Sequence, residues 1–504
     1  MPKVTIIGAG LAGSLLAIYL ARRGFAVDIY ESRGDMRKEQ VAAGRSINLA
    51  LSDRGIAALR QVGMDEYMLA EAIPMHGRMI HSSAGETKLL PYSGRNGEYI
   101  NSISRGGLNI ALINEAEKYP RVNFHFNEPC VDFDCLTGEA RLESGKVVKA
   151  DTLIATDGAG SAVRQAMERQ LPNFQMSSVF LEHGYKELHI PPLPELQSHG
   201  ITGPHQTARG IEQALGPDRD LFAIEKNVLH IWPRHKFMMI ALPNFDGSFT
   251  CTLFLAHKSI SYSRGDVDPA SVDRADLSRE PSFDRLTDRK SLHDFFEREF
   301  PDAMRLMPTI EEDFFENPTG LLGTVKCFPW NVGGKALLLG DSAHAVVPFY
   351  GQGMNCAFED VRVLDELIEK HIEPIPLVAE SASTSIDWEA IYVEFGNLRK
   401  ANTDAIADMA EENFYEMRDA TADPVFVKKR ELETKLEQTF PDYFSKYSMV
   451  TFREDLPYSI AKAKGNVQDK LLMEICRRIE SVSELDLDDV IEQVRSRRGQ
   501  SHPS

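Results

Sequence analysis

The feature that most constrains this chain is a glycine-rich turn between a short apolar run and a segment with helical apolar spacing. Residues Val4–Ile7 have the character of a buried strand, and residues 14–23 repeat apolar side chains at helical intervals. Between them the chain reads Gly8-x-Gly10-x-x-Gly13. A strand, such a turn and a helix in succession predict the first unit of a Rossmann-like α/β domain.

The same unit predicts a dinucleotide site. A second strand at 27–30 is followed by Glu31, which lies 18 residues beyond Gly13. The glycines permit a tight turn and the close approach of a pyrophosphate, whose charge the helix N-terminus stabilises. Glu31 is placed to bind an adenosine ribose and would repel a 2′-phosphate, so FAD or NAD is expected rather than NADP. The predicted contacts of this unit are Gly8, Gly10, Leu11, Ala12, Gly13 and Glu31.

Two acidic turns follow apolar strands farther along the chain. Asp157 comes directly after a strand predicted at 152–155, and Asp341 comes directly after one predicted at 336–339. Taken singly, Asp-Gly and Gly-Asp dipeptides are common turns. The three motifs at these separations are far more specific than any one of them.

The composition excludes several classes of function. The chain has 504 residues, 43% hydrophobic and 26% charged, with a formal net charge of −19. This charge disfavours nucleic acid and anionic membrane surfaces as partners. The six cysteines are scattered without a Cys-x-x-Cys pair, so no metal site is predicted, and reduced thiols in the cytoplasm are expected. No targeting segment or membrane anchor is visible, because no apolar run approaches about 18 residues.

The remaining chain alternates between strand-rich and helical character. Short strands are predicted around 130–155 and over 224–256, the latter with turns at Pro233-Arg234 and Asp246-Gly247. The polar segment 258–290 is predicted to be an exposed insertion or mobile loop. Beyond about residue 353 the pattern is helical almost to the end, with breaks at Pro374 and Pro376 and again at Asp423-Pro424.

The glycine turn and the acidic turns at 157 and 341 together resemble those of the single-component FAD-dependent aromatic hydroxylases, over the chain up to about residue 360. The resemblance implies an α/β fold with a Rossmann-like FAD-binding domain, a β-sheet substrate domain and a C-terminal helical region. The FAD-binding domain would comprise 1–75, 105–172 and 325–372, the substrate domain 76–104 and 173–324, and the helical domain 373–504.

Longer strings resemble one branch of this family, the kynurenine 3-monooxygenases. The matching segments are 44–52, 73–75, 78–81, 230–234, 240–244, 248–254, 347–355 and 447–452. The resemblance implies hydroxylation of L-kynurenine to 3-hydroxy-L-kynurenine through a flavin C4a-hydroperoxide. It also implies FAD as cofactor, with NADPH and O2 as co-substrates; the preference for NADPH over NADH is an inference from the family alone.

The resemblance supplies expected roles. The substrate carboxylate would be bound by Arg78, Tyr92, Asn413 and Tyr447. The aromatic ring would be enclosed by Ile240, Leu242, Thr252, Phe254, Pro348, Phe349 and Met417. Beyond the first motif, the flavin would contact Arg45, Arg105, Asp157, Asp341, Gly353, Met354 and Asn355. No catalytic side chain is expected, because the cofactor carries the chemistry.

Some features depart from the family or leave alternatives open. Tyr350 stands where relatives carry His or Phe, and segments 190–225 and 258–290 are longer and more polar than expected. The hydrophobic C-terminal anchor of eukaryotic relatives is missing, so a soluble bacterial-type member is expected. The alternatives are a hydroxylase of another aromatic ring and a flavin-binding regulator without turnover. The sequence does not decide the oligomeric state; a homodimer is one alternative.

Overall fold

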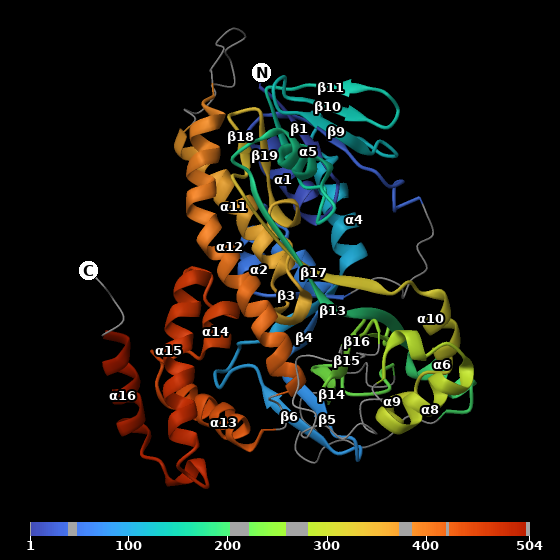
Figure 1. Ribbon diagram of the computed structural model, residues 1–504, viewed down its shortest axis with the longest axis vertical. Coiled ribbons are helices and arrows are strands. Elements are labelled where there is room, and N and C mark those ends of the chain that lie inside the picture. The colour runs from blue at the N-terminus through green and yellow to red at the C-terminus, as the bar shows by residue number, and fades with distance from the viewer. Residues whose placement is uncertain are drawn as a thin grey trace, which may run out of the picture.

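The computed structural model describes residues 2–38, 48–201, 221–258, 281–371, 386–419 and 423–499. Figure 1 shows three layers of structure in space. A parallel sheet with its helices fills the upper part, and a second sheet with short helices lies below it. Helices of the C-terminal third run along one side of both sheets.

The first sheet carries the glycine turn. Its six described strands follow the order β18-β19-β12-β1-β2-β8, and β1 pairs in parallel with β12 and β2. The expected strands near residues 4–7, 27–30 and 152–155 are confirmed. The bounds are β1 Lys3–Ile7, β2 Ala26–Tyr30, β8 Val122–His125, β12 Thr152–Ala155, β18 Asn331–Val332 and β19 Ala336–Leu338.

Helices cover this sheet and complete its core. Leu15, Leu16 and Leu20 of the first helix are fully buried against strands such as β1 and β2. Two small antiparallel sheets, β9–β11 and β3-β7-β4, lie at its margins. The helices are α1 Leu11–Arg22, α2 Asp53–Gln61, α3 Asp65–Ala70, α4 Arg105–Ala116, α5 Ala162–Gln170 and α11 Gly353–His371. The small-sheet strands are β3 Asn48–Leu51, β4 Ile73–Met75, β7 Ile100–Ser104, β9 Cys130–Asp134, β10 Glu139–Leu142 and β11 Val147–Val148.

The second sheet has seven described strands in the order β17-β13-β16-β15-β14-β5-β6. Short helices pack against one face of it (Figure 1). Its strands are β5 Gly77–His81, β6 Thr87–Pro91, β13 Gln175–Ile190, β14 Leu229–Arg234, β15 Phe237–Pro243, β16 Phe249–Ala256 and β17 Gly320–Phe328. The helices are α6 Leu193–Ser198, α8 Arg289–Glu299, α9 Pro301–Met304 and α10 Ile310–Glu316.

Strand alternation divides the side chains of this second sheet between two cores. The odd-numbered residues of β16, such as Cys251 and Leu253, face the short helices. The other face carries Phe254 and, on β15, Leu242. The register places Ile240 directly opposite Thr252. This second face, which also carries Arg78 of β5, is turned toward the C-terminal helices.

The C-terminal third is helical, as the sequence predicts. Its break at Asp423-Pro424 is confirmed, because Asp423 caps a new helix by accepting a hydrogen bond from Val425 N at 2.8 Å. Pro374 and Pro376 lie outside the described residues. The helices are α12 Trp388–Asp419, α13 Pro424–Thr439, α14 Lys446–Thr451, α15 Tyr458–Cys476 and α16 Leu487–Gly499.

The turn predicted at Pro233-Arg234 is wrong by two residues. Both residues belong to β14, and the chain reverses at His235, which has a left-handed φ of 58°. The neighbouring strand β5 pairs with β14 only as far as Ile231. Pro233, which has no N–H to donate, therefore stands where no strand on that side needs a donor.

The loop predicted over 258–290 is wrong in its last part. Residues 259–280 lie outside the described residues, as do 202–220 of the 190–225 segment. From residue 281 the chain is ordered: Leu286 is buried, and Asp288 begins α8 by accepting a hydrogen bond from Ser291 N at 2.8 Å. The segment contains few apolar residues, so the sequence pattern did not indicate that Leu286 is buried.

The described helices include none that is long and apolar enough to cross a lipid bilayer. The division into three domains stays a prediction. The structure has two large sheets and a layer of C-terminal helices, but it does not test the predicted bounds.

Candidate active site

The glycine turn has the geometry that a pyrophosphate requires. Gly8 has a φ of 100°, and a methyl group there would lie 2.6 Å from the Thr156 carbonyl oxygen. A methyl group on Gly13 would lie 2.0 Å from the Gly8 carbonyl oxygen. Gly10, in contrast, faces open space, with no atom within 4 Å of such a group. Two glycines therefore let the backbone segments pack closely, and the third leaves room for a ligand.

The first turn of α1 is open to an anion. Its N-cap residue is Gly10, and no side chain caps the helix. The partly exposed Leu11 and Ala12 begin the helix, so their backbone N–H groups and the positive end of the helix dipole face the same space as Gly10.

Glu31 lies at the end of β2 beside this turn. Its carboxylate is 5% exposed and accepts hydrogen bonds from Ala9 N at 2.7 Å and from Arg33 Nε at 2.7 Å. Burial acts to raise the pKa of Glu31, but the hydrogen bonds and the charge of Arg33 outweigh it and hold the pKa below its ordinary value. The group is therefore an anion, suited to accept hydrogen bonds from ribose hydroxyls.

The two acidic turns meet at the same edge of the sheet. Asp157 follows β12, and its Oδ2 accepts a hydrogen bond from Ala162 N at 2.9 Å. Its buried Oδ1 has no partner among the described residues. Asp341 follows β19 and is reachable by solvent, yet the protein around it raises its pKa, against the opposing charges of His344 and Arg105.

The N-terminus of α11 opens on the same region. Gly353 and Met354 are partly exposed, whereas Asn355 is fully buried. The Asn355 side chain accepts a hydrogen bond from Ser52 N at 2.9 Å and donates one to Ala50 O at 2.8 Å. Asn355 therefore ties α11 to the end of β3.

Of the two arginines predicted to contact the flavin, the structure describes only Arg105. Arg105 is exposed at the first position of α4, close enough for its charge to oppose the rise in the pKa of Asp341 that desolvation by the surrounding protein causes. Arg45 lies outside the described residues. The vacant space over Gly10, the unpartnered Asp157 oxygen and the accessible Asp341 together fit an extended dinucleotide such as FAD.

A second set of predicted residues lines one face of the seven-stranded sheet. Leu242, Phe254, Phe349, Met417 and the partly buried Ile240 belong to one apolar cluster. Thr252 lies opposite Ile240 and is 8% exposed. Pro348 is exposed beside this cluster. The cluster also contains Met238, Phe414 and Tyr350, for which no role was predicted; the spacing of Met238, two residues before Ile240, could have revealed it.

Arg78 faces a stack of phenol rings next to this cluster. The Tyr92 and Tyr447 rings are stacked with centroids 5.3 Å apart, and the Arg78 guanidinium lies 5.0 Å from the Tyr447 centroid. The Tyr350 ring also stacks on Tyr447, with centroids 5.6 Å apart. Burial raises the pKa of Tyr92 and Tyr447 above the ordinary value, against the charge of Arg78, so both stay neutral donors. Arg78 forms no ion pair with any described residue.

The predicted Asn413 reaches the same pocket but already has a partner. Its Nδ2 donates a hydrogen bond to Phe349 O at 2.6 Å. This bond leaves the Asn413 amide oxygen as the atom available to a ligand. The space among its lining side chains, open solvent included, is about 390 Å³, and only a small part of it admits a water-sized sphere.

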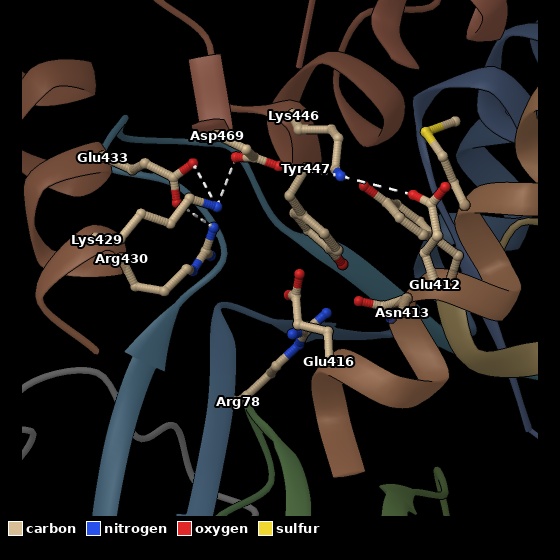
Figure 2. A pocket seen from close by; sticks show the side chains of 12 residues that line it. Arg78, Glu412, Asn413, Glu416, Lys429, Arg430, Glu433, Lys446, Tyr447 and Asp469 are labelled. Carbon is tan, nitrogen blue, oxygen red and sulfur yellow. Dashed lines mark hydrogen bonds and ion pairs between the residues drawn. The ribbon is translucent and has the colours of Figure 1, made fainter. Parts of the chain in front are cut away.

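The sequence did not single out the ionic residues of this pocket. Figure 2 shows Glu416 directed into the space between Arg78 and Tyr447, with Lys429 and Asp469 to one side. Lys429 Nζ lies 2.6 Å from the Asp469 carboxylate. Glu416 forms no ion pair with another described residue. Its spacing of three residues from Asn413 on one helix is the signal that could have indicated it.

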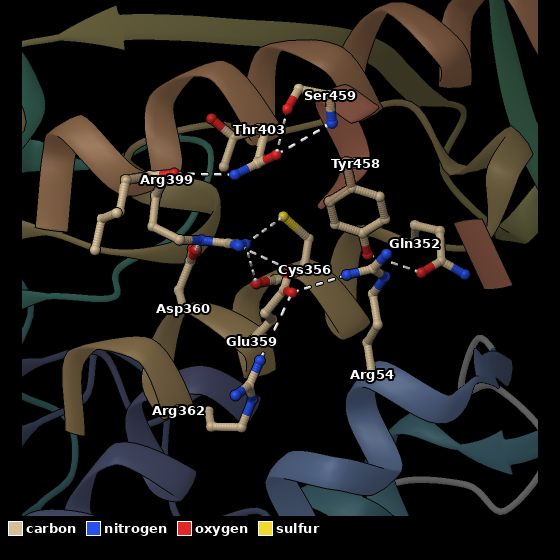
Figure 3. Close-up of polar contacts among 12 residues, drawn as sticks. Arg54, Gln352, Cys356, Glu359, Asp360, Arg362, Arg399, Thr403, Tyr458 and Ser459 are labelled. Carbon is tan, nitrogen blue, oxygen red and sulfur yellow. Dashed lines mark hydrogen bonds and ion pairs between the residues drawn. The ribbon is translucent and has the colours of Figure 1, made fainter. Parts of the chain in front are cut away.

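Three potential metal ligands, His344, Cys356 and Asp360, lie within 4.8 Å of one another. The Arg399 guanidinium supplies the positive charge there: its Nε is 2.7 Å from Asp360, and its Nη2 is 3.5 Å from Cys356 Sγ (Figure 3). His344 Nε2 lies 2.6 Å from the other Asp360 oxygen. This arrangement satisfies the buried carboxylate and accounts for the cluster.

Comparison with known families agrees with the site. The FAD binding domain family matches residues 1–232 and 324–373, which hold the glycine turn and both acidic turns. The fold and the site thus define an FAD-binding flavoprotein of the monooxygenase type.

The most similar relatives specify the branch. A protein of Myxococcus xanthus named kynurenine 3-monooxygenase is 44% identical over 98% of this chain and 95% of its own. One of Dictyostelium discoideum with the same name is 41% identical over 94% of this chain and 93% of its own. The chain belongs to the kynurenine 3-monooxygenase family.

Solved structures share the fold at lower identity. Tetrameric 2-methyl-3-hydroxypyridine-5-carboxylic acid oxygenase has a TM-score of 0.59 at 18% identity, with 86% of this chain and 97% of that one covered. A salicylate hydroxylase substrate complex has a TM-score of 0.58 at 17% identity, with 92% and 97% covered.

We predict that Gly10→Ala and Gly13→Ala separate cofactor binding from stability. Gly10→Ala should weaken FAD binding while the melting temperature of the apoprotein is unchanged, because its methyl group meets only the space for the ligand. Gly13→Ala should lower both, because its methyl group collides with backbone. FAD titration and thermal unfolding of the apoprotein measure the two effects. Unaltered FAD affinity in Gly10→Ala would contradict the assignment.

Proposed function

We propose that this protein hydroxylates L-kynurenine at C3, with FAD as cofactor and NADPH and O2 as co-substrates. The observation that carries the proposal is an arginine without an ion pair among the described residues, placed beside phenol hydroxyls and an apolar slot. Such a pocket suits an aromatic amino acid. The names of relatives that are 41–44% identical support the same substrate.

The carboxylate of the substrate would bind at Arg78. A guanidinium forms directional, charge-assisted hydrogen bonds to a carboxylate, and the buried Tyr92 hydroxyl, which has no partner among the described residues, is a second donor. Tyr447 would donate from the opposite ring of the stack. The Asn413 amide oxygen accepts hydrogen bonds, so it would serve the α-ammonium group at this end of the substrate and not the carboxylate.

Glu416 would bind the α-ammonium group. An amino acid carries both charges on one carbon, so its site needs an anion close to the arginine. Glu416 lines the same pocket as Arg78, and its charge also acts on Lys429, Arg430 and Lys446 there. It forms no ion pair within 4.0 Å with those described residues. Glu416 thus adds a residue to the site that the resemblance did not supply.

The ring would lie against the apolar sheet face. Ile240 and Leu242 form one wall, and Phe254 packs on Phe349 at 4.9 Å to form another. These side chains orient the ring and exclude water from the reacting atoms. Pro348 and Met417 would complete the enclosure, and Thr252 would line the sheet.

Bound FAD supplies the redox chemistry, accepting a hydride and activating O2. The chain would hold the dinucleotide at the glycine turn, Glu31, Asp157, Asp341 and Arg105. The first turn of α11, at Gly353 and Met354, offers N–H groups and a positive dipole end to negative charge on the flavin ring. We also propose a cytoplasmic location, which the six unpaired cysteines support.

We predict that the FAD-loaded protein oxidises NADPH in a kynurenine-dependent manner and forms 3-hydroxykynurenine. Absorbance at the NADPH band and mass spectrometry of the product measure the two. Anthranilate- and phenol-like compounds serve as comparison substrates. Turnover of one of these without turnover of kynurenine would overturn the substrate, and a flavin that NADPH cannot reduce would overturn the activity.

We predict that Arg78→Met raises the KM for kynurenine by roughly 10- to 150-fold, the equivalent of about 1.5–3 kcal/mol for a hydrogen bond to a charged group. FAD should stay bound. Kynuramine, which lacks the carboxylate, is the matched control: wild type and variant should use it equally. Equal KM values for kynurenine would remove Arg78 from the carboxylate site.

We predict that Glu416→Gln raises the KM for kynurenine by about fivefold, since a neutral hydrogen bond replaces a charge-assisted one. An analogue without the α-amino group should bind wild type and variant with the same affinity. If both compounds lose affinity equally, Glu416 acts on the shape of the pocket and not on the ammonium.

A further inference from the structure

A buried arginine, Arg54, lies outside the pocket and contacts two helices. We take one of them, α14, to face the substrate and the other, α11, to face the flavin. Arg54 of α2 is 1% exposed, and its Nη1 lies 2.8 Å from Glu359 of α11. Its Nε donates to Val450 O of α14 at 3.1 Å, and its Nη2 donates to Arg453 O at 3.0 Å. Helix α14 carries Tyr447 of the substrate pocket. One guanidinium therefore contacts the substrate-side helix and the flavin-side helix.

The face of the same guanidinium supports a tyrosine. The Arg54 guanidinium carbon lies 3.9 Å from the ring centroid of Tyr458, the first residue of α15 (Figure 3). At this distance a buried cation and an aromatic ring attract one another strongly. The edges of Arg54 are held by backbone carbonyls and a carboxylate, so the ring of Tyr458 is held in a fixed place.

The Tyr458 hydroxyl reaches the residue just before α11. It donates a hydrogen bond to Gln352 Oε1 at 2.9 Å. The Gln352 side-chain amide nitrogen also lies 3.3 Å from Ser52 Oγ. The backbone carbonyl of Gln352 accepts the hydrogen bond from Cys356 N at 2.8 Å that begins the helix. The position of Gln352 therefore sets where the first turn of α11 lies.

We propose that Tyr458, held on Arg54, is a positioning residue that fixes the N-terminal turn of α11 against the flavin and links that turn to α14. The inference rests on the proposed function, because α11 is taken to face the flavin and Tyr447 the substrate. The C-terminal helices then do more than enclose the substrate. A displacement of α14 on substrate binding would pass through Val450, Arg54 and Tyr458 to the flavin ring.

Tyr458→Phe tests the proposal, because it removes the hydroxyl and keeps the ring over Arg54. The matched control is Tyr392→Phe, which also removes a buried hydroxyl, in that case one that lies 2.7 Å from Thr152 Oγ1 in the core of the first sheet. Both variants should lose similar thermal stability. Only Tyr458→Phe should weaken FAD binding and shift the visible flavin spectrum, measured without kynurenine.

With kynurenine present, Tyr458→Phe should lower kcat by about three- to tenfold, the scale of one buried hydrogen bond, while KM changes by less than about twofold. The kynurenine-induced change in flavin absorbance should shrink by a similar factor. Identical flavin spectra and kcat in the two tyrosine variants, or a change in KM alone, would overturn the proposal. Absence of hydroxylation by the wild type would instead overturn the proposed function, while the FAD measurements would still decide the role of Tyr458.

A double-mutant cycle with Gln352→Met tests the route of the effect. If the hydroxyl acts through Gln352, the double variant should lose no more FAD affinity than either single variant. Effects that multiply would show that Tyr458 acts elsewhere and would overturn the proposed link.

Discussion

The cofactor half of the protein depends on the close approach of three backbone segments, those of β1, α1 and β12. Gly8 and Gly13 permit it, since a methyl group on either would collide with a carbonyl oxygen. The approach sets the ends of parallel strands side by side, with Thr156 Oγ1 donating to Gly8 O at 2.8 Å. Glu31, Asp157 and Asp341 follow the carboxyl ends of β2, β12 and β19, so one constraint on packing gathers these carboxylates at one edge.

The second sheet works by a different rule, the alternation of side chains along strands. On one face, the rings of His81 and Trp232 stack with their centroids 4.1 Å apart, on the side of the short helices. Ile240 and Phe254 on the other face belong to the apolar cluster that we propose as the wall around the substrate ring. Arg78 lies on the same face of the sheet, so a positive charge stands at the end of an apolar surface. This pairing is what an amphiphilic aromatic substrate requires.

The C-terminal helices complete both halves. They supply Asn413, Glu416 and Tyr447 to the pocket, and they bury ionic groups that contact α11. Arg399 of α12 lies 2.8 Å from Glu359 and 2.7 Å from Asp360, both in α11. Burial acts to raise the pKa of Asp360, but His344 and Arg399 hold it below its ordinary value, so the carboxylate stays charged and paired. The helical layer therefore secures α11, the helix proposed to face the flavin, and also contributes side chains to the pocket.

The sequence predicted correctly those elements that depend on residues close together in the chain. The glycine turn, the strand before it and the start of α13 at Pro424 were all predictable, because turn chemistry, apolar periodicity and capping act over a few residues. The predicted turn at Pro233 failed because the edge position of that proline depends on where β5 stops pairing, which the sequence of β14 does not contain. The anchored part of 258–290 was missed for the same reason, since Leu286 is buried in a cluster that strands and helices from several parts of the chain form together.

The sequence by itself determined the Rossmann-like unit, the preference for a dinucleotide without a 2′-phosphate and, through resemblance to a family, the residues to consider for the pocket. Only the tertiary structure decided which side chains share a space. Glu416 beside Arg78, Asn413 engaged with Phe349 and Tyr458 stacked on Arg54 all join residues that are far apart in the chain. No short-range pattern encodes such pairs, because the packing of α12, α14 and α15 on the two sheets brings them together.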